Sequence, residues 1–314
     1  GLNFILQNVQ FLNCRSENKN GGGAIYCYIG ASDAELPTLI FNIDQCSFEH
    51  CKSKCGGACA INCRKGKRGI SITNTTFQSN LATSTSDPTV SSSDFLTKGG
   101  GGGALLLGLQ TATISNCTFE NNTCTYGSNI AIVSTNKAGD TKVVLQNCSI
   151  SFPTTTDTDV KSSLYFATGS NLKLYLSIEG NTFLSTGLQE NQYHINGTKL
   201  TSFSIGKDNC YTNSDDENYL FSPDFSSALS EQDNKIELCS PSPIDPTPII
   251  ETCQEGTEHN TSRTVSFSDC VFRDYYDAAE PGGAIYCGIV GSGTLYGLNF
   301  ILQNVQFLNC RSEN

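Results

Sequence analysis

A short pair of motifs recurs along the chain and limits the folds that are open to it. A Gly-Gly-Ala-apolar segment such as Gly22–Cys27 is followed by a short run that ends in an aromatic or aliphatic anchor. The anchors are Phe11, Phe48, Phe77, Phe119, Ile150, Phe183, Phe272 and Phe307. The first six lie 29 to 42 residues apart, and similar but unequal spacing is typical of fixed strands joined by loops of variable length.

Alternation within each run predicts which face is buried. Side chains two residues apart lie on the same face of a strand, so Cys117 and Phe119 point one way while Asn116 and Thr118 point the other. The apolar face must be the buried one. Such strands, stacked on their equivalents from neighbouring repeats, give parallel sheets around a continuous core. We therefore expect an all-β fold, a β-solenoid whose glycine pairs mark tight turns or close backbone approaches.

The two motifs also resemble those of a known family. Gly-Gly-Ala followed by Ile, Leu or Val, paired with F-x-x-N, is similar to the repeats of chlamydial polymorphic outer membrane proteins and of large protist surface proteins. Phe77–Asn80 and Phe119–Asn122 match F-x-x-N in full, whereas Phe11–Cys14, Phe48–Cys51 and Phe183–Thr186 depart at the fourth position. The resemblance covers residues 1–186 and 266–314. It implies a right-handed parallel β-helix of the pectin-lyase type, a surface location and a structural or adhesive role.

The motifs divide the chain into three parts. Residues 1–186 and 265–314 are expected to form coils with variable loops. Between 187 and 264 the pattern fades, and we expect degenerate coils with long loops there, with a protruding insertion as the alternative. Residues 203–205, 219–221 and 235–238 could supply strands in this part. The Pro-rich stretch at 240–248 is unsuited to a central strand.

A second, longer repeat joins the two ends of the chain. The eighteen residues Gly1–Asn18 recur unchanged at Gly297–Asn314, an offset of 296 residues. Self-similarity at a fixed offset indicates a repeat architecture, so we interpret the chain as slightly more than one period of a tandem array, rather than an engineered duplication or a circular permutation. Residues 297–314 would then start the next period. With eight or nine coils per period, each period would lengthen a fibre by about 40 Å.

The composition of the chain indicates which kinds of partner it can bind and in which compartment it is found. A net charge of −11 opposes nucleic-acid binding. No apolar run approaches the roughly 20 residues of a membrane helix, so no membrane span is expected in this part of the protein. Sixteen cysteines together with six N-x-S/T sequons favour an oxidising compartment, outside the cell or at its surface.

The sequons supply the candidate N-glycosylation sites. They are Asn74, Asn116, Asn121, Asn147, Asn196 and Asn260. Asn74, Asn116 and Asn147 are expected on the outward face of equivalent strands, about 5 Å apart per coil, either as a crowded row of glycans or as a ladder of hydrogen-bonded asparagines. Asn196 and Asn260 are expected in loops, where a glycan is sterically easier.

The repeat also suggests partners for the cysteines. Cys14 and Cys51 lie three residues after their anchors on coils that should be adjacent, a placement compatible with a disulfide. Cys310 is the equivalent of Cys14 and would pair in the next period, and Cys27 and Cys287 end identical segments, so that a bridge there would join one period to the next. Cys117 and Cys148 share an inward column, either bridged or as stacked thiols. For Cys51, Cys55, Cys59 and Cys63, disulfides are favoured over a zinc site, because the usual C-x-x-C pairs are missing.

Signals for catalysis are weak. His50, His194 and His259 show no Ser/His/Asp order and no His-x-x-x-His spacing, and Asp215–Glu217 is interpreted as a solvated loop. We therefore expect no enzyme, no cofactor and no metal. The favoured function is that of a structural protein, one period of a secreted or cell-surface glycoprotein that forms a disulfide-stitched filament with neighbouring periods or with copies of itself. The alternative is a surface adhesin that binds glycans or host cell-surface ligands, and a polysaccharide-cleaving enzyme is a distant third.

Overall fold

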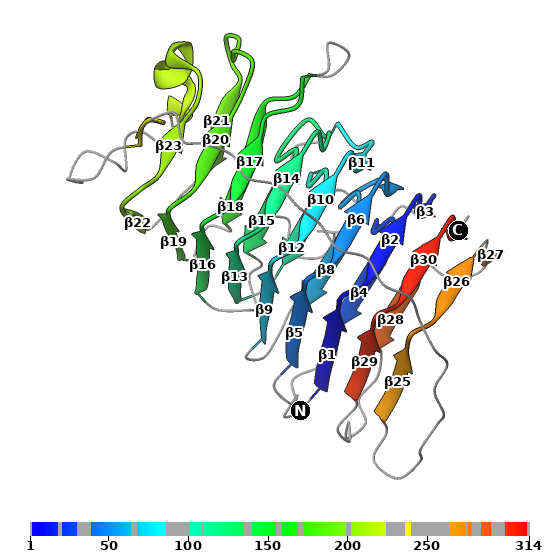
Figure 1. The fold of residues 1–314 in the computed structure, drawn as a ribbon. Helices are drawn as coiled ribbons and strands as arrows, with labels where there is room; N and C mark the ends of the chain where they lie inside the picture. Colours follow the sequence, from blue (N-terminus) through cyan, green and yellow to red (C-terminus); the bar gives the residue numbers. More distant parts are fainter. Residues whose placement is uncertain are drawn as a thin grey trace.

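The computed structural model is an all-β molecule with parallel sheets, which confirms the fold class at that level (Figure 1). It describes residues 2–17, 21–29, 39–63, 68–85, 101–108, 110–134, 140–154, 159–168, 173–198, 202–223, 236–239, 264–273, 276–277, 284–289 and 299–312. Within these residues the strands form four sheets, here named A to D, together with one short 3-10 helix, η1 (Ser214–Tyr219).

Sheets A and B are the longest of the four. In spatial order, sheet A contains β22 (Ser202–Ile205), β19 (Leu174–Glu179), β16 (Thr141–Gln146), β13 (Thr111–Ser115), β9 (Arg68–Thr73), β5 (Leu39–Asp44), β1 (Leu2–Gln7), β29 (Asn299–Gln303) and β25 (Thr264–Ser268). Sheet B contains β24 (Glu237–Leu238), β23 (Cys210–Tyr211), β20 (Thr182–Leu184), β17 (Ser149–Ser151), β14 (Thr118–Glu120), β10 (Thr76–Gln78), β6 (Ser47–Glu49), β2 (Gln10–Leu12), β30 (Gln306–Leu308) and β26 (Val271–Arg273).

Sheets C and D complete the cross-section. Sheet C contains β11 (Leu81–Ala82), β7 (Lys52–Ser53), β3 (Arg15–Ser16), β31 (Arg311–Ser312) and β27 (Tyr276–Asp277). Sheet D contains β21 (Tyr193–Thr198), β18 (Ser162–Thr168), β15 (Ile130–Ser134), β12 (Leu105–Gly108), β8 (Cys59–Cys63), β4 (Ile25–Ile29) and β28 (Ile285–Ile289). The chain passes from β1 in sheet A through β2, β3 and β4 in the other three sheets, and returns with β5 beside β1. One such passage is called a rung below.

A single residue in the left-handed backbone region turns the chain from sheet A to sheet B in each rung. This first corner, three residues before each anchor, has φ between 50° and 65° and is occupied by Asp269, Asn304, Asn8, Gln45, Asn74, Asn116, Asn147, Gly180 and Asp208. A second corner, two residues after the anchor, has φ between 51° and 54° and is occupied by Asn309, Asn13, His50, Ser79 and Asn121. Asn, Asp and Gly tolerate this conformation better than other residues, which explains why they recur at these positions.

The anchors stack into one column through the core, here named the anchor column. Phe11, Phe48, Phe77 and Phe119 are fully buried, and the rings of neighbouring rungs lie nearly parallel with centroids 4.6 to 5.0 Å apart. The predicted alternation is confirmed, because Cys117 is buried beside this column. The offset-stacked geometry of like rings adds to the burial of apolar surface in holding one rung on the next.

The glycine pairs lie where the rungs approach most closely, as the sequence predicted. A Cβ atom added to Gly57 would lie 1.9 Å from the carbonyl oxygen of Gly103, and one added to Gly23 would lie 2.2 Å from that of Gly57. No side chain fits between these backbones. The recurring Gly-Gly-Ala motif is thus explained by packing between rungs.

The rungs do not follow chain order from one end of the stack to the other. Strands expected in the degenerate part are found at β22 and β24, and Ile195 forms a parallel bridge with Phe221. The next described segment, 264–312, does not continue from β24. It lies at the opposite end of the stack, with β29 against β1 (Figure 1). The expected continuous succession of coils is therefore interrupted, because residues 299–312 repeat the sequence of 3–16 and match the first rung as a neighbour. The Pro-rich stretch lies outside the described residues.

Candidate functional site: the stacked copies of the repeated segment

The two copies of the eighteen-residue repeat lie directly against each other. β1 pairs with β29, β2 with β30 and β3 with β31, and in every pair each residue faces its own copy, as Phe4 faces Phe300 and Phe11 faces Phe307. The register therefore equals the sequence offset of 296 residues. The segment is self-complementary as a parallel neighbour of itself.

Side chains of the two copies continue this pairing. The ring centroids of Phe4 and Phe300 are 4.9 Å apart, and those of Phe11 and Phe307 are also 4.9 Å apart with an angle of 3° between the planes. Outside the core, amide side chains form a ladder in which Asn8 Nδ2 donates to Asn304 Oδ1 (2.9 Å), Asn13 Nδ2 to Asn309 Oδ1 (3.3 Å) and Gln306 Nε2 to Gln10 Oε1 (3.2 Å). An amide donates and accepts at once, so identical amides can stack without a mismatch.

Sheet D differs from the other sheets at this junction. In sheets A, B and C the duplicate strands β29, β30 and β31 separate the last rung from the first. In sheet D, β28 pairs directly with β4, and Cys287 faces Cys27 in the identical segments that these strands contain. The sequence predicted that Cys287 lies one step from the equivalent of Cys27 in the next period, whereas here it faces Cys27 of its own period. A bridge that joins one period to the next stays a prediction.

Cys14 lies between two other cysteines at the same junction. Its Sγ lies within hydrogen-bond distance of the carbonyl oxygens of Leu12 (3.8 Å) and Phe307 (3.7 Å), and the thiol interacts with Cys310 on one side and with Cys51 on the other. The contact with Cys310 lowers the pKa of the Cys14 thiol, but the contact with Cys51 and burial outweigh it, so the pKa is raised well above its ordinary value. Cys14 and Cys51 are thiols in this structure. Their side chains interact on neighbouring rungs, and the disulfide between them remains a prediction.

The thiols of Cys117 and Cys148 also stack on consecutive rungs. A hydrogen bond between the two thiols, together with burial, raises the pKa of Cys117, and the same hydrogen bond lowers the pKa of Cys148. Burial is the main cause that raises the pKa of Cys46 to about 12, and it does the same for Cys55. With a raised pKa, the thiols of Cys46, Cys55 and Cys117 are poor nucleophiles, because the thiolate is the reactive form. Cys117 and Cys148 are thiols in this structure, and a bridge between them stays a prediction.

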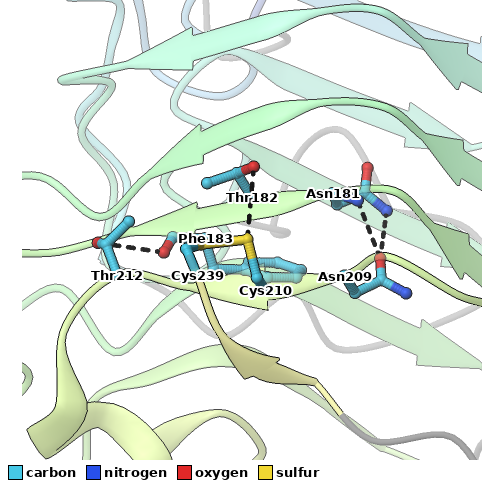
Figure 2. The surroundings of a disulfide bond; sticks show 7 residues. All are labelled: Asn181, Thr182, Phe183, Asn209, Cys210, Thr212 and Cys239. Atoms are coloured by element: carbon cyan, nitrogen blue, oxygen red, sulfur yellow. Dashed lines mark hydrogen bonds between the residues drawn. A yellow bond between two sulfur atoms is a disulfide. The ribbon is translucent and has the colours of Figure 1, made fainter. Parts of the chain in front are cut away.

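The disulfide found among the described residues joins Cys210 and Cys239, whose Cα atoms are 4.9 Å apart (Figure 2). It links β23 to the segment that follows β24. Figure 2 shows it beside Phe183 and a buried amide ladder in which Asn181 Nδ2 donates to Asn209 Oδ1 (3.0 Å). The sequence did not predict this bridge. The two cysteines are 29 residues apart, which is within the range of rung lengths and could have indicated that they lie on neighbouring rungs. This part of the chain lacks the motifs that would have aligned the two rungs.

The sequon asparagines occupy structural corners. Asn74, Asn116 and Asn147 are exposed at the first corner of neighbouring rungs, and Asn121 is exposed at the second. Their outward position agrees with the prediction. Their left-handed backbone conformation favours asparagine, which explains why asparagine occurs at these positions independently of any glycan.

The last two sequons, at Asn196 and Asn260, do not lie at described corners. Asn196 was expected in a loop, but it is a half-buried residue within β21 with Tyr165 as its neighbour on β18. It is therefore a less accessible acceptor than predicted. Asn260 lies outside the described residues.

A buried polar cluster occupies the end of the stack near β20. Asp216, in η1, accepts hydrogen bonds from the Ser185 hydroxyl and from the backbone N–H of Leu188 (3.1 Å), and its Oδ2 lies 3.2 Å from His194 Nε2. The interpretation of the Asp215–Glu217 run as a solvated loop is wrong for Asp216, which is fully buried. Its burial tends to raise the pKa of the carboxyl, but the hydrogen bonds from His194 and Ser185 lower it below its ordinary value.

The cluster does not form a catalytic triad. A serine nucleophile needs a histidine as its base, but here the carboxylate stands between the serine and the histidine. His194 and Asp216 are both closed off from solvent. The arrangement can fasten η1 and the segment around Leu188 to the last rungs, and no substrate can reach the histidine.

A groove of about 420 Å³ lies along the outer side of sheet B near this end. Most of its lining is apolar, with Phe152 and Leu184 among the residues, and polar groups also line it from Thr118, Glu120, Ser149, Ser151 and Thr212. Ser185 also lines the groove, yet its hydroxyl is engaged by Asp216. The groove therefore offers hydrogen-bonding groups without an activated nucleophile.

In the part of the chain that the structure describes, no three His, Cys, Asp or Glu side chains gather to hold a metal ion. Cys51 and Cys59 lie in the main core, whereas Cys55 belongs to a separate apolar cluster with Tyr26 and Leu106. These positions disfavour a zinc site shared by Cys51, Cys55 and Cys59.

Among the same residues, no helix is long and apolar enough to cross a membrane.

Comparisons with protein-family models, with curated proteins and with solved structures find no match to this chain.

Proposed function

We propose that this chain is a structural module of a rod, one period of a tandem-repeat protein that folds as a right-handed parallel β-helix. The observation on which this rests is the in-register stacking of the two copies of the repeated segment. A segment that fits against itself can end one period and begin the next without a change of cross-section. The parallel crossovers between sheets support the right-handed sense, which such connections nearly always adopt.

The setting we propose is extracellular. Sixteen cysteines and a disulfide between adjacent strands support an oxidising compartment. Exposed sequon asparagines at the corners support a glycoprotein. The resemblance of the Gly-Gly-Ala and F-x-x-N motifs to those of chlamydial and protist surface proteins points to the same location, and bridges such as Cys14 to Cys51 would stitch neighbouring rungs together.

The groove on sheet B favours one alternative function, that of an adhesin. Hydroxyl-bearing side chains of successive rungs repeat at the spacing of parallel strands, about 4.8 Å, and could contact a glycan or a polar cell-surface ligand along the stack. In this case the rod would serve as a stalk. Substitution of Ser149 and Ser151 by Asp should then abolish binding to cells while the length of the rod is unchanged.

The rod function is tested by the dependence of shape on the number of periods. Chains of one, two and three periods, joined at the natural offset of 296 residues, are purified and imaged by negative-stain electron microscopy. We expect particles of constant width whose length grows by about 40 Å per period. Particles that grow in all dimensions, or beads on a flexible string, would refute the proposal.

A further inference from the structure

Both ends of the stack leave core positions uncovered. Phe267 in β25 occupies the same inward column as Leu302 and Leu6, which are 1% and 0% exposed, yet Phe267 is 39% exposed. At the other end, Leu238 in β24 continues the anchor column beyond Phe183 and Tyr211, yet it is 51% exposed. These side chains are exposed because each belongs to the last strand of its sheet.

The two open ends are complementary in direction and position. β24 is the terminal strand of sheet B at one end of the stack and β26 is the terminal strand of the same sheet at the other. All described strands of the sheet are parallel. The edge of β24 that pairs with no described strand can therefore pair with the corresponding edge of a β26 that runs in the same direction. In chain order, β24 and the rung that begins at β25 are successive, and a continuous stack would bring them together.

We propose that the β24 end of one molecule docks on the β25–β26 end of a second copy, so that sheet B continues from chain to chain through β24 and β26. Leu238 then covers Phe272 of the anchor column, a partly buried residue that stacks on Phe307 and contacts the ring of Phe267. The contact joins two different faces, which makes it heterologous and open-ended. This inference rests on the rod function and supplies the interface by which separate chains extend the rod.

The test uses the full chain and one charged substitution at each end. Sedimentation velocity over a range of concentrations measures association of the wild type, of Leu238→Glu and of Phe267→Asp. A buried charge without a partner opposes docking, so each variant alone should associate at least about tenfold more weakly, which corresponds to about 1.4 kcal/mol. Ile40→Glu and Val144→Glu are the matched controls, because Ile40 and Val144 are 44% and 37% exposed on the sides of the stack and away from its ends. Both should associate like the wild type.

Mixing the two end variants tests the head-to-tail geometry. Leu238→Glu retains an intact β25 end and Phe267→Asp retains an intact β24 end, so an equimolar mixture should form dimers and nothing longer. Equal weakening by the end and side variants, or a mixture without dimers, would overturn the proposal. So would a wild-type chain that stays monomeric at every concentration. If multi-period chains still form rods in that case, the rod function stands and only the interface between chains is refuted.

Discussion

At the scale of single residues, the corners explain the abundance of asparagine better than glycosylation alone. Asn116 has φ 53° and an exposed side chain. A residue other than Gly, Asn or Asp in this conformation costs about 1 to 2 kcal/mol. In protein made without glycans, Asn116→Ala should therefore lower the free energy of unfolding by about 1 kcal/mol, whereas Asn116→Gly should leave it nearly unchanged. Urea denaturation measures both, and equal losses in the two variants would contradict a backbone role.

Asp216 should make stability depend on pH in acid. Its pKa is lowered in the folded protein, so its contribution is fully present above the unfolded value of about 3.9 and is lost as the pH falls through the folded value. Asp216→Asn should destabilise the chain at neutral pH by about 1 to 3 kcal/mol, and the difference from wild type should shrink below pH ~4.

The control for this residue is its exposed neighbour Asp215. Asp215→Asn should follow the wild-type unfolding curve at every pH. A gap between Asp216→Asn and wild type that stays constant from neutral to acid pH would show that the carboxylate charge contributes nothing.

At the scale of elements, the glycine pairs set how closely one rung lies on the next. Gly57→Ala would place a methyl group 1.9 Å from the backbone oxygen of Gly103, and backbone on both sides prevents relief. The expected loss of unfolding free energy is about 3 kcal/mol or more. Gly69→Ala is the matched control, since the nearest atom to its added Cβ is the side-chain oxygen of Thr111 at 2.5 Å, which can rotate away. Its effect should stay below about 1 kcal/mol.

Strands and their faces could be predicted because period-two alternation is a local property. Cys117 and Phe119 were placed inward from their spacing alone, and the glycine pairs from their recurrence. The buried pair of His194 and Asp216 could not be predicted, since those residues are 22 apart in a part of the chain without motifs. The bridge from Cys210 to Cys239 escaped for the same reason. The left-handed backbone at the corners was also not predicted. The same N-x-S/T triplet occurs whether its asparagine is needed for a turn or for the attachment of a glycan.

At the scale of the whole molecule, the order of the rungs depends on contacts between distant segments. The sequence predicted that coils succeed each other in chain order, but nothing in a local pattern decides which end of a stack a late segment joins. Residues 299–312 can lie beside β1 because residues 3–16, which have the same sequence, form the first rung. Because the segment fits against its own copy, residues 299–312 can stack on β1 of the same period, as in a single chain. In a long array the corresponding residues can instead begin the next period, so a single period and a long array can differ in the order of their rungs.

A cross-link decides which arrangement a single chain adopts. Gln10 and Gln306 face each other on β2 and β30 with their side-chain amides 3.2 Å apart, and adjacent strands place Cα atoms within the range of a disulfide. In dilute solution, Gln10→Cys with Gln306→Cys should oxidise to an intramolecular bridge, identified by mass spectrometry of the linked peptides. The control, Gln10→Cys with Glu237→Cys, pairs two exposed positions on strands far apart in sheet B and should give no such peptide. If the chain stacked in sequence order instead, β30 would lie beyond β24, more than about 30 Å from β2, and the bridge between positions 10 and 306 would not form in the monomer.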